Sequence, residues 1–267
     1  MSLDPKDPRY AQITILSILT ILQMFWADFG PSPAILALNV STALAVQYAC
    51  SRMVGMRFDF RSPLITSLSL TVLLKASALW IYPLAVLVAI GSKFILRAGG
   101  SHIFNPANIG IVAMLLAFPH WVWVAPGQWG SALWLAFLLA AFGCLVLYRV
   151  PSRDMTLFFL GGWLALIFGR ALWLGDPLAI PLHQIQNGAM LIFAFFMISD
   201  PKTIPVRWPG RLIFALAVCV IAFILNIEWH IRESLFYALA LVCMARPALD
   251  SMWRAERRPW VTEGGKS

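Results

Sequence analysis

Long apolar runs alternate with short polar stretches along the whole chain. Ten apolar segments can be drawn, at about 11–28, 33–51, 62–74, 81–97, 105–119, 131–148, 155–174, 188–199, 209–227 and 232–248. A helix that spans a bilayer needs about 20 mostly apolar residues, so this pattern predicts an all-α polytopic membrane protein with about ten transmembrane segments. Hydrophobic residues make up 60% of the 267 residues and the mean hydropathy is +0.79, which leaves room for a single membrane domain over 1–267.

Two of the segments are too short to cross a membrane as ordinary helices. Residues 62–74 and 188–199 would extend about 20 Å as helix, whereas the hydrocarbon core is about 30 Å thick. They are the third and eighth of ten, so they take the same place in a first repeat (11–119) and a second repeat (131–248). Short or broken helices at matching places in two antiparallel halves predict a five-plus-five inverted repeat with a site near the midplane. The alternative is that both are ordinary tilted helices whose ends are hidden by polar residues.

The positive charges support this segment count. With these boundaries, 17 of the 20 Lys and Arg residues fall on one side, including Lys93 and Arg97 in one loop and Arg246 in the tail. Such an excess marks the cytoplasmic side, so both termini (1–10 and 249–267) are predicted to be cytoplasmic in the cell inner (plasma) membrane. The net charge of +8 then reflects topology and anionic lipid at the inner face, where RAERRPW (254–260) is a predicted anchor, rather than nucleic-acid binding. The start, MSLDPKDPRY, has no cleavage site typical of a signal peptide.

Two Pro-containing motifs follow or precede apolar runs at corresponding places in the halves. SHIFNPANIG (101–110) contains Asn105-Pro106, and FFMISDPKTIP (195–205) contains Asp200-Pro201 directly after the short eighth segment. Asn is a good N-cap and Pro suits the first helical position, so each motif is predicted to start a helix whose free N–H groups face a ligand. Such groups suit the carbonyl edge of a flavin ring, and they equally suit a transported polar solute. The alternative is a pair of ordinary capped loops.

Charged and metal-binding side chains add few candidates. Lys75 ends the short third segment at the place that Asp200 takes in the second half, and an intramembrane charge is a functional hypothesis by default. Arg170 lies toward the end of its segment and is expected to snorkel outward. The four cysteines lack CxxC spacing, which argues against a zinc or iron–sulfur site. The remaining histidines fall beside loops without metal-ligand spacing and are interpreted as interfacial, at His120, His183 and His230.

Taken together, FNPAN and FFMISDPKTIP are specific enough to indicate a family. The sequence resembles the NqrB/RnfD family, the flavin-carrying membrane subunits of sodium-pumping NADH:quinone oxidoreductase and of the Rnf complex. The likeness runs over about 35–252 and rests on SPLITSLSLTVLL (62–74), GSKFILRAGGSHIFNPANIGIV (91–112), GQWGSALWLAFLL (127–139), FAFFMISDPKTIPVRWPGRLIFAL (193–216) and ALVCMARPALD (240–250). The resemblance implies ten helices in a bundle similar to ammonium and urea channels. It also implies non-covalent riboflavin and an FMN esterified to a Thr.

The covalent FMN attachment motif is missing. The loop that would carry it, HWVWVAPGQWG (120–130), contains no Ser or Thr, and NGAM (187–190) and GSAL (130–133) lack the required Thr. Covalent FMN is therefore not predicted, and the cofactor expected is riboflavin or FMN held non-covalently between the two halves. Short members without the motif, similar to UnbU-like proteins, occur near enediyne-type gene clusters. The predicted cofactor-binding residues are His102, Phe104, Asn105, Pro106, Asn108, Ser199, Asp200, Pro201, Thr203 and Lys75.

Three functions remain open from the sequence. The first is a redox subunit, not catalytic alone, that binds flavin and passes electrons across the membrane with other membrane subunits. The second is a transporter or channel for a small molecule, such as a flavin or a natural product, since similar bundles conduct solutes. The third is a scaffold that binds nothing.

Overall fold

The computed structural model describes residues 7–26, 30–125, 141, 153–185 and 187–253. Within them the chain forms helices and four short strands, and it divides into two compact units. The first unit holds Met1–His102 and Pro106–Ala125, and the second holds Ile103–Asn105 and Pro126–Arg257. Four described helices, Pro33–Met53, Arg153–Leu174, Trp208–Ile227 and Ser234–Met252, are long and apolar enough to cross a membrane.

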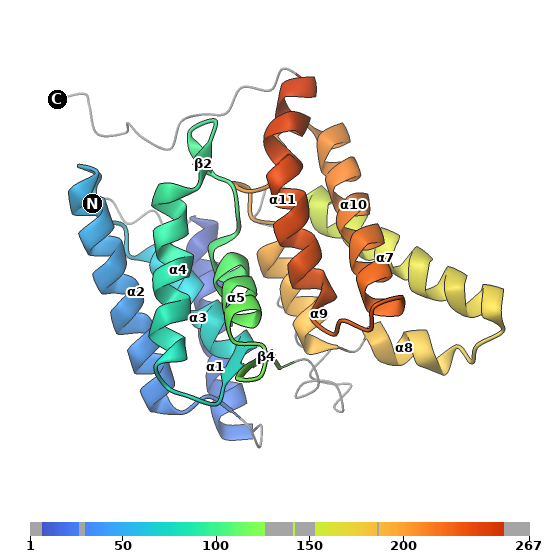
Figure 1. Cartoon of the computed structure of the whole chain (residues 1–267), viewed down its shortest axis with the longest axis horizontal. Coiled ribbons are helices and arrows are strands. Elements are labelled where there is room, and N and C mark those ends of the chain that lie inside the picture. The colour runs from blue at the N-terminus through green and yellow to red at the C-terminus, as the bar shows by residue number, and fades with distance from the viewer. Residues whose placement is uncertain (1–6, 27–29, 126–140, 142–152, 186, 254–267) are drawn as a thin grey trace. The chain divides into compact units, whose positions relative to one another are not determined.

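The first unit is built around one short, polar helix. Helix α3 (Arg61–Leu73) contacts α1 (Pro8–Trp26), α2 (Pro33–Met53), α4 (Ile81–Ile95) and α5 (Pro106–Ala117), as Figure 1 shows. Its hydroxyl side chains bond back to its own carbonyls, as Thr71 Oγ1 does to Ser67 O at 2.8 Å, which lets Ser and Thr lie buried in a helix. The predicted short third segment is therefore a short helix at the centre of this unit.

Small residues bring α4 and α5 close together. A Cβ on Gly110 would lie 2.8 Å from Ala85 O and 2.9 Å from Ala89 Cβ, so only glycine fits there without a shift. Two antiparallel ribbons complete the unit. Strand β1 (Leu74–Ala76) pairs with β4 (Val122–Val124), and β2 (Arg97–Ala98) pairs with β3 (Ser101–His102). The all-α prediction missed these strands because each is only two or three residues long.

The second unit packs α10 (Trp208–Ile227) against both α7 (Arg153–Leu174) and α11 (Ser234–Met252). Helix α8 (Ala179–Ile185), which the hydrophobic pattern did not predict, contacts α7. Helix α9 (Gly188–Ile192) is capped by the Asn187 side chain and continues directly into a π-helical turn, η1 (Phe193–Met197). The predicted eighth segment is thus a short, buried helix, whereas the predicted sixth (131–148) lies almost entirely outside the described residues.

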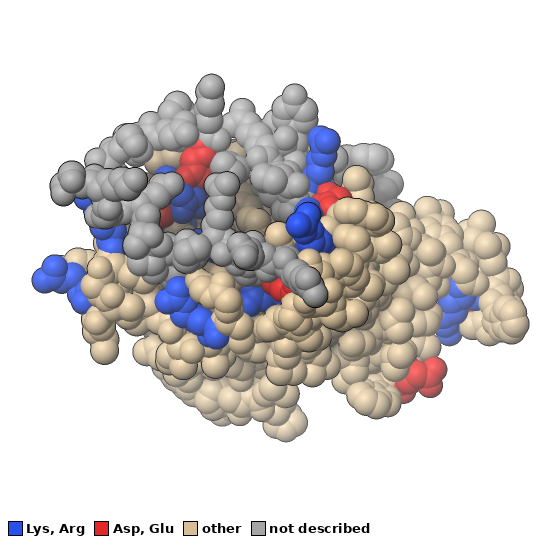
Figure 2. Space-filling view, turned by 90° about the horizontal axis from the view of Figure 1, so that it is seen from above, with Lys and Arg blue, Asp and Glu red and all other residues tan. Residues whose placement is uncertain are grey.

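The surface of the described residues suits an apolar surrounding. Figure 2 shows a face on which uncharged residues predominate and charged residues form small, separate groups. Exposed apolar side chains include Phe25 at 82%, Trp173 at 88% and Leu172 at 73%. Contiguous apolar exposure of this kind is rare on water-soluble monomers and is expected of helices that face lipid.

Candidate functional site

The end of α3 gathers buried polar side chains from three other elements of the first unit. Gln23 of α1 donates from Nε2 to Val72 O at 3.1 Å, and Asn39 of α2 donates from Nδ2 to Thr71 Oγ1 at 2.9 Å. Lys75 follows in β1, directly after the helix ends. We call Gln23, Asn39, Thr71 and Lys75 the α3-end cluster. All four are nearly inaccessible, with exposed fractions from 0% to 7%.

Three polar atoms of this cluster have no hydrogen-bond partner among the described residues. They are Gln23 Oε1, Asn39 Oδ1 and Lys75 Nζ. Leaving a buried polar atom unpaired costs about 1–3 kcal/mol, and an unpaired ammonium costs more. One donor group and two acceptors therefore stand ready around the same helix end, a pattern typical of a site that receives water or a polar ligand.

The other predicted residues of the first unit lie away from Lys75. His102 is in β3 and is 3% exposed, and Asn108, near the start of α5, is 1% exposed. Helix α5 begins at Pro106, as the Asn-Pro motif predicted, and it runs for 12 residues toward β4, the partner of Lys75's strand. Lys75 and His102 thus lie toward opposite ends of α5, about 18 Å apart along its axis.

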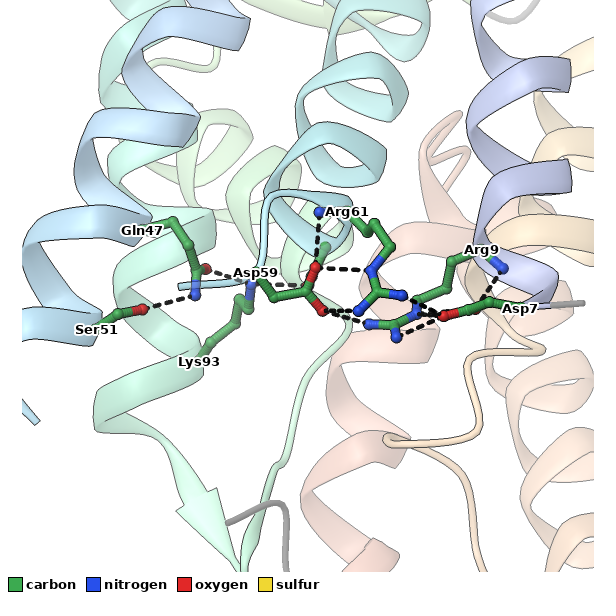
Figure 3. Close-up of polar contacts among 8 residues, drawn as sticks. Asp7, Arg9, Gln47, Ser51, Asp59, Arg61 and Lys93 are labelled. Carbon is green, nitrogen blue, oxygen red and sulfur yellow. Dashed lines mark hydrogen bonds and ion pairs between the residues drawn. The ribbon is translucent and has the colours of Figure 1, made fainter. Parts of the chain in front are cut away.

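A buried lysine at the other end of α3 was missed by the sequence analysis. Lys93 was predicted in a cytoplasmic loop, but it lies in α4 and is 0% exposed. Its Nζ donates to Gln47 Oε1 at 2.8 Å and to Ser62 Oγ at 2.9 Å, and Gln47 Nε2 donates to Ser51 Oγ at 3.2 Å. Figure 3 shows Lys93 and Ser51 meeting the two ends of the Gln47 amide. The prediction failed because it read Lys93 only as a boundary charge, although an apolar run surrounds it.

Beside this lysine, four charged side chains tie α1 to the start of α3. Arg9 reaches Asp7 at 2.7 Å and Asp59 at 2.6 Å, and Arg61 reaches Asp7 at 2.8 Å and Asp59 at 2.9 Å (Figure 3). Burial raises the pKa of Asp7, but the hydrogen bonds and charge of Arg9 outweigh it, and the pKa ends below its ordinary value. Burial likewise raises the pKa of Asp59, and the hydrogen bonds of Arg61 then bring it below its ordinary value.

In the second unit, the predicted residues converge on the π-helical turn. Asn105 Nδ2 donates to Met197 O at 3.3 Å, and Ser199 Oγ donates to Phe195 O at 2.6 Å. Thr156 of α7 donates from Oγ1 to Ala194 O at 2.8 Å. A π-turn leaves backbone carbonyls off the regular ladder, and side-chain donors satisfy them here. The structure therefore brings Asn105 and Ser199 together around η1.

Asp200-Pro201 starts no helix, contrary to the prediction. Asp200 Oδ1 accepts from Lys202 N at 3.0 Å, and its carbonyl accepts from Thr203 N at 3.0 Å and Thr203 Oγ1 at 3.2 Å. The carboxylate thus closes a turn on its own backbone, which competes with helix formation, and α10 begins only at Trp208. Pro201 is exposed, Phe104 is half-buried and Thr203 is buried.

Arg246 is a second charge that the sequence analysis misplaced. It was assigned to the tail, but it lies in α11, is 1% exposed and donates from Nη1 to Lys202 O at 2.9 Å. A buried arginine at the Asp200 turn fixes the carbonyls that Pro201 cannot pair through a helix. The spacing between Asp200 and Arg246 gave no local signal, because the contact joins segments 44 residues apart.

Comparison with known proteins gives the family. The family model described as NQR2, RnfD, RnfE family matches residues 124–258. The chain belongs to this family. Proteins named as the D-type component of an ion-translocating oxidoreductase complex align with most of it. The protein from Alcanivorax borkumensis is 25% identical over 90% of this chain and 87% of its own length, and that from Pseudomonas paraeruginosa is 28% identical over 80% and 81%.

Within the NQR2, RnfD, RnfE family match lie η1, the Asp200 turn and Arg246, whereas Lys75 and Asn105 precede it. The relative from Pseudomonas aeruginosa, 26% identical, spans 86% of this chain, so likeness extends beyond the family match. The resemblance expected from FNPAN and FFMISDPKTIP is thereby confirmed. The described part of the chain offers buried hydrogen-bonding groups rather than a group of His, Cys, Asp and Glu that could hold a metal ion.

Proposed function

We propose that this chain is the D-type membrane component of an ion-translocating oxidoreductase complex and takes part in transmembrane electron transfer. The support is its family and the relatives named as subunits of such complexes, which align over most of both chains. The sequence has no CxxC spacing for an iron–sulfur cluster, so electron transfer calls for other membrane subunits as partners.

The proposal extends to location and topology. The chain lies in the inner membrane with both termini cytoplasmic, and its ten segments form a five-plus-five inverted repeat in a single membrane domain, similar to ammonium and urea channels. The charge asymmetry supports this topology, and so do the short helices α3 and α9–η1 at the third and eighth places. The basic run 254–260 binds anionic lipid at the inner face; it lies outside the described residues.

The cofactor proposed is riboflavin or FMN held without a covalent bond. The α3-end cluster fits a flavin ring edge, which carries carbonyl acceptors beside an N–H donor, because the cluster offers an unpaired ammonium and two unpaired amide oxygens. Bound there, a flavin would supply electron acceptance and donation. Lys75 would donate to ring oxygen and hold positive charge beside it, while Gln23 and Asn39 would accept from ring N–H and fix its orientation.

The remaining predicted contacts stand as part of the same proposal. They are His102, Phe104, Asn105, Pro106, Asn108, Ser199, Asp200, Pro201 and Thr203. Since about 18 Å of α5 separates His102 from the strand that pairs with β1, one ring cannot contact both His102 and Lys75. The single observation that favours the α3-end cluster is the buried, unpartnered Lys75 ammonium.

The deciding experiment is an absorption spectrum of the detergent-purified chain, followed by acid precipitation and chromatography of the supernatant. A yellow protein that releases about one flavin per chain supports the proposal, and flavin retained in the pellet would contradict the non-covalent attachment. Asn105→Ala and Asp200→Ala, tested beside Lys75→Met, would show which predicted contacts hold the flavin. A colourless protein, even after incubation with flavin, would overturn the flavin proposal and favour a transporter or channel on the same fold.

A further inference from the structure

The second unit contains a pocket of about 140 Å³ that the proposed function does not use. It lies among α7, α8, α10 and the start of α11. Its polar lining includes Trp163 and Arg170 from α7, Asp176, Asn226 from α10, and Arg232. Apolar side chains of the same elements form the walls, so the pocket combines a few placed polar groups with an apolar surround, as ligand sites do.

The deep part of the pocket holds an unsatisfied donor. Trp163 is 8% exposed, and its Nε1 has no hydrogen-bond partner among the described residues. Its ring stacks on Phe159 with centroids 6.3 Å apart, which helps to hold the indole in this orientation. A buried indole N–H usually finds a partner, so this one calls for an acceptor oxygen from water or a ligand.

Positive charge is in excess at the lining. Arg170 Nη1 pairs with Asp176 Oδ2 at 3.1 Å, which neutralises one guanidinium. Arg232 is exposed, and no ion pair joins it to another described residue. Asn226 Nδ2 reaches Ile231 O only at 3.5 Å, so that amide is weakly held. The polar lining therefore offers donors and one unmatched positive charge.

Size and spacing restrict the ligand. A cavity of about 150 Å³ holds one benzene-sized group, so a pocket of about 140 Å³ is too small for a flavin ring system. Trp163 and Arg170 are seven residues apart, about 10 Å along the axis of α7. A single small oxyanion cannot reach both levels, whereas a molecule with two acceptor groups along its length can.

We propose that this pocket binds an anionic phospholipid, with its phosphate held by Arg232 and an ester carbonyl accepting from Trp163 Nε1–H. Guanidinium groups bind phosphate strongly. The acyl chains do not fit the pocket and would lie against exposed apolar side chains of α7, such as Leu172 and Trp173. Inorganic phosphate shares the oxyanion chemistry but would meet only the arginine, so Trp163 distinguishes the two sources.

The test measures thermal unfolding of the delipidated full chain in detergent. The ligands are phosphatidylglycerol, phosphatidylcholine with the same acyl chains, and inorganic phosphate. We expect phosphatidylglycerol to raise the midpoint by several degrees and to do so more than phosphatidylcholine. Trp163→Phe, which removes only the N–H donor, and Arg232→Gln should each weaken the apparent lipid affinity about tenfold, as the loss of a charge-assisted or buried hydrogen bond predicts.

Matched controls are Trp173→Phe, at an exposed position of the same helix, and Arg207→Gln, an exposed arginine directly before α10. Both should keep the wild-type response. The proposal is overturned if phosphatidylglycerol gives no shift, or if neither pocket variant changes it. It is also overturned if inorganic phosphate reproduces the whole effect and Trp163→Phe is silent, which would indicate a free-phosphate site.

Discussion

Lys75 carries a charge in a place where folding gains nothing from it. Its ammonium is buried without a partner, so Lys75→Met, which keeps the length and removes the charge, should leave the thermal midpoint unchanged or raise it. The same variant should bind flavin about tenfold more weakly, the loss expected for one charge-assisted hydrogen bond. Titration of the flavin-depleted protein, followed by ring absorbance, measures the affinity.

The reduction potential gives a second, independent measure for Lys75. A positive charge beside the ring favours its reduced form, so the midpoint potential of flavin retained by Lys75→Met should fall. The exposed Arg57→Met serves as the control and should change neither property. If Lys75→Met binds flavin with wild-type affinity and potential, the α3-end cluster is not the site, whatever the flavin content of the wild type.

Lys93 is the opposite case, since its buried charge is held by Gln47 and Ser62. Lys93→Ala should destabilise the first unit by about 3 kcal/mol, because it opens a cavity and leaves two buried acceptors unpaired. Thermal unfolding in detergent should show a midpoint several degrees lower. Arg57→Ala, at an exposed loop position, should be nearly silent; equal effects of the two variants would contradict the buried position of Lys93.

Single residues show what a sequence pattern can and cannot predict. Lys75 was identified as a candidate because it interrupts an apolar run, and that local signal was sufficient. Gln23 and Asn39 were missed, because an amide in an apolar helix looks the same whether or not it is paired. Their roles depend on contacts with Val72 and Thr71, which lie 49 and 32 residues away in the chain.

At the scale of elements, the joint between α1 and α3 should be sensitive to acid. The pKa of Asp59 is lowered in the folded state, so its contribution to stability is complete above the ordinary carboxyl pKa of about 4 and is lost as the pH falls through the lower, folded value. Asp59→Asn should lower the unfolding midpoint at pH 7 by about 1 kcal/mol equivalent, as expected for a partly exposed network.

The measurement is the midpoint of wild type and Asp59→Asn as a function of pH. The difference between them should persist from pH 7 to about 5 and close below about 4, when Asp59 of the wild type takes up its proton. Asp176→Asn, at the Arg170 pair of the second unit, tests whether any lost ion pair behaves alike. A difference that grows toward low pH would contradict the sign derived for Asp59.

The elements themselves were predictable to different degrees. The length of each apolar run gave the short α3 and the short α9–η1, and Asn105-Pro106 gave the start of α5 at Pro106. The same rule failed at Asp200-Pro201, since the Asp200 side chain bonds to Lys202 N and closes a turn. Capping residues signal both helix starts and turns, and only the partners that their side chains find decide between them.

At the scale of the whole molecule, the topology can be tested across α3. Its 13 residues extend about 20 Å, less than the hydrocarbon core of about 30 Å, yet the charge pattern places its two ends on opposite sides of the membrane. Arg57 and Ser77 flank the helix and are both exposed, so cysteines at these positions should react equally well with a maleimide once the membrane is opened. In intact cells, a membrane-impermeant maleimide should label Ser77→Cys and leave Arg57→Cys unlabelled.

The background for this labelling is a chain whose four cysteines are replaced; of these, Cys219 and Cys243 are buried thiols. Labelling of both positions from outside, or of neither, would mean that α3 enters and leaves on the same side. The first half would then cross the membrane an even number of times, so the two halves would no longer be antiparallel and the inverted repeat would fail. Labelling of Ser77→Cys alone would instead require the membrane to be bridged by a 13-residue helix plus β1. That would place the unpaired Lys75 within reach of the bilayer interior, where a buried charge demands a function.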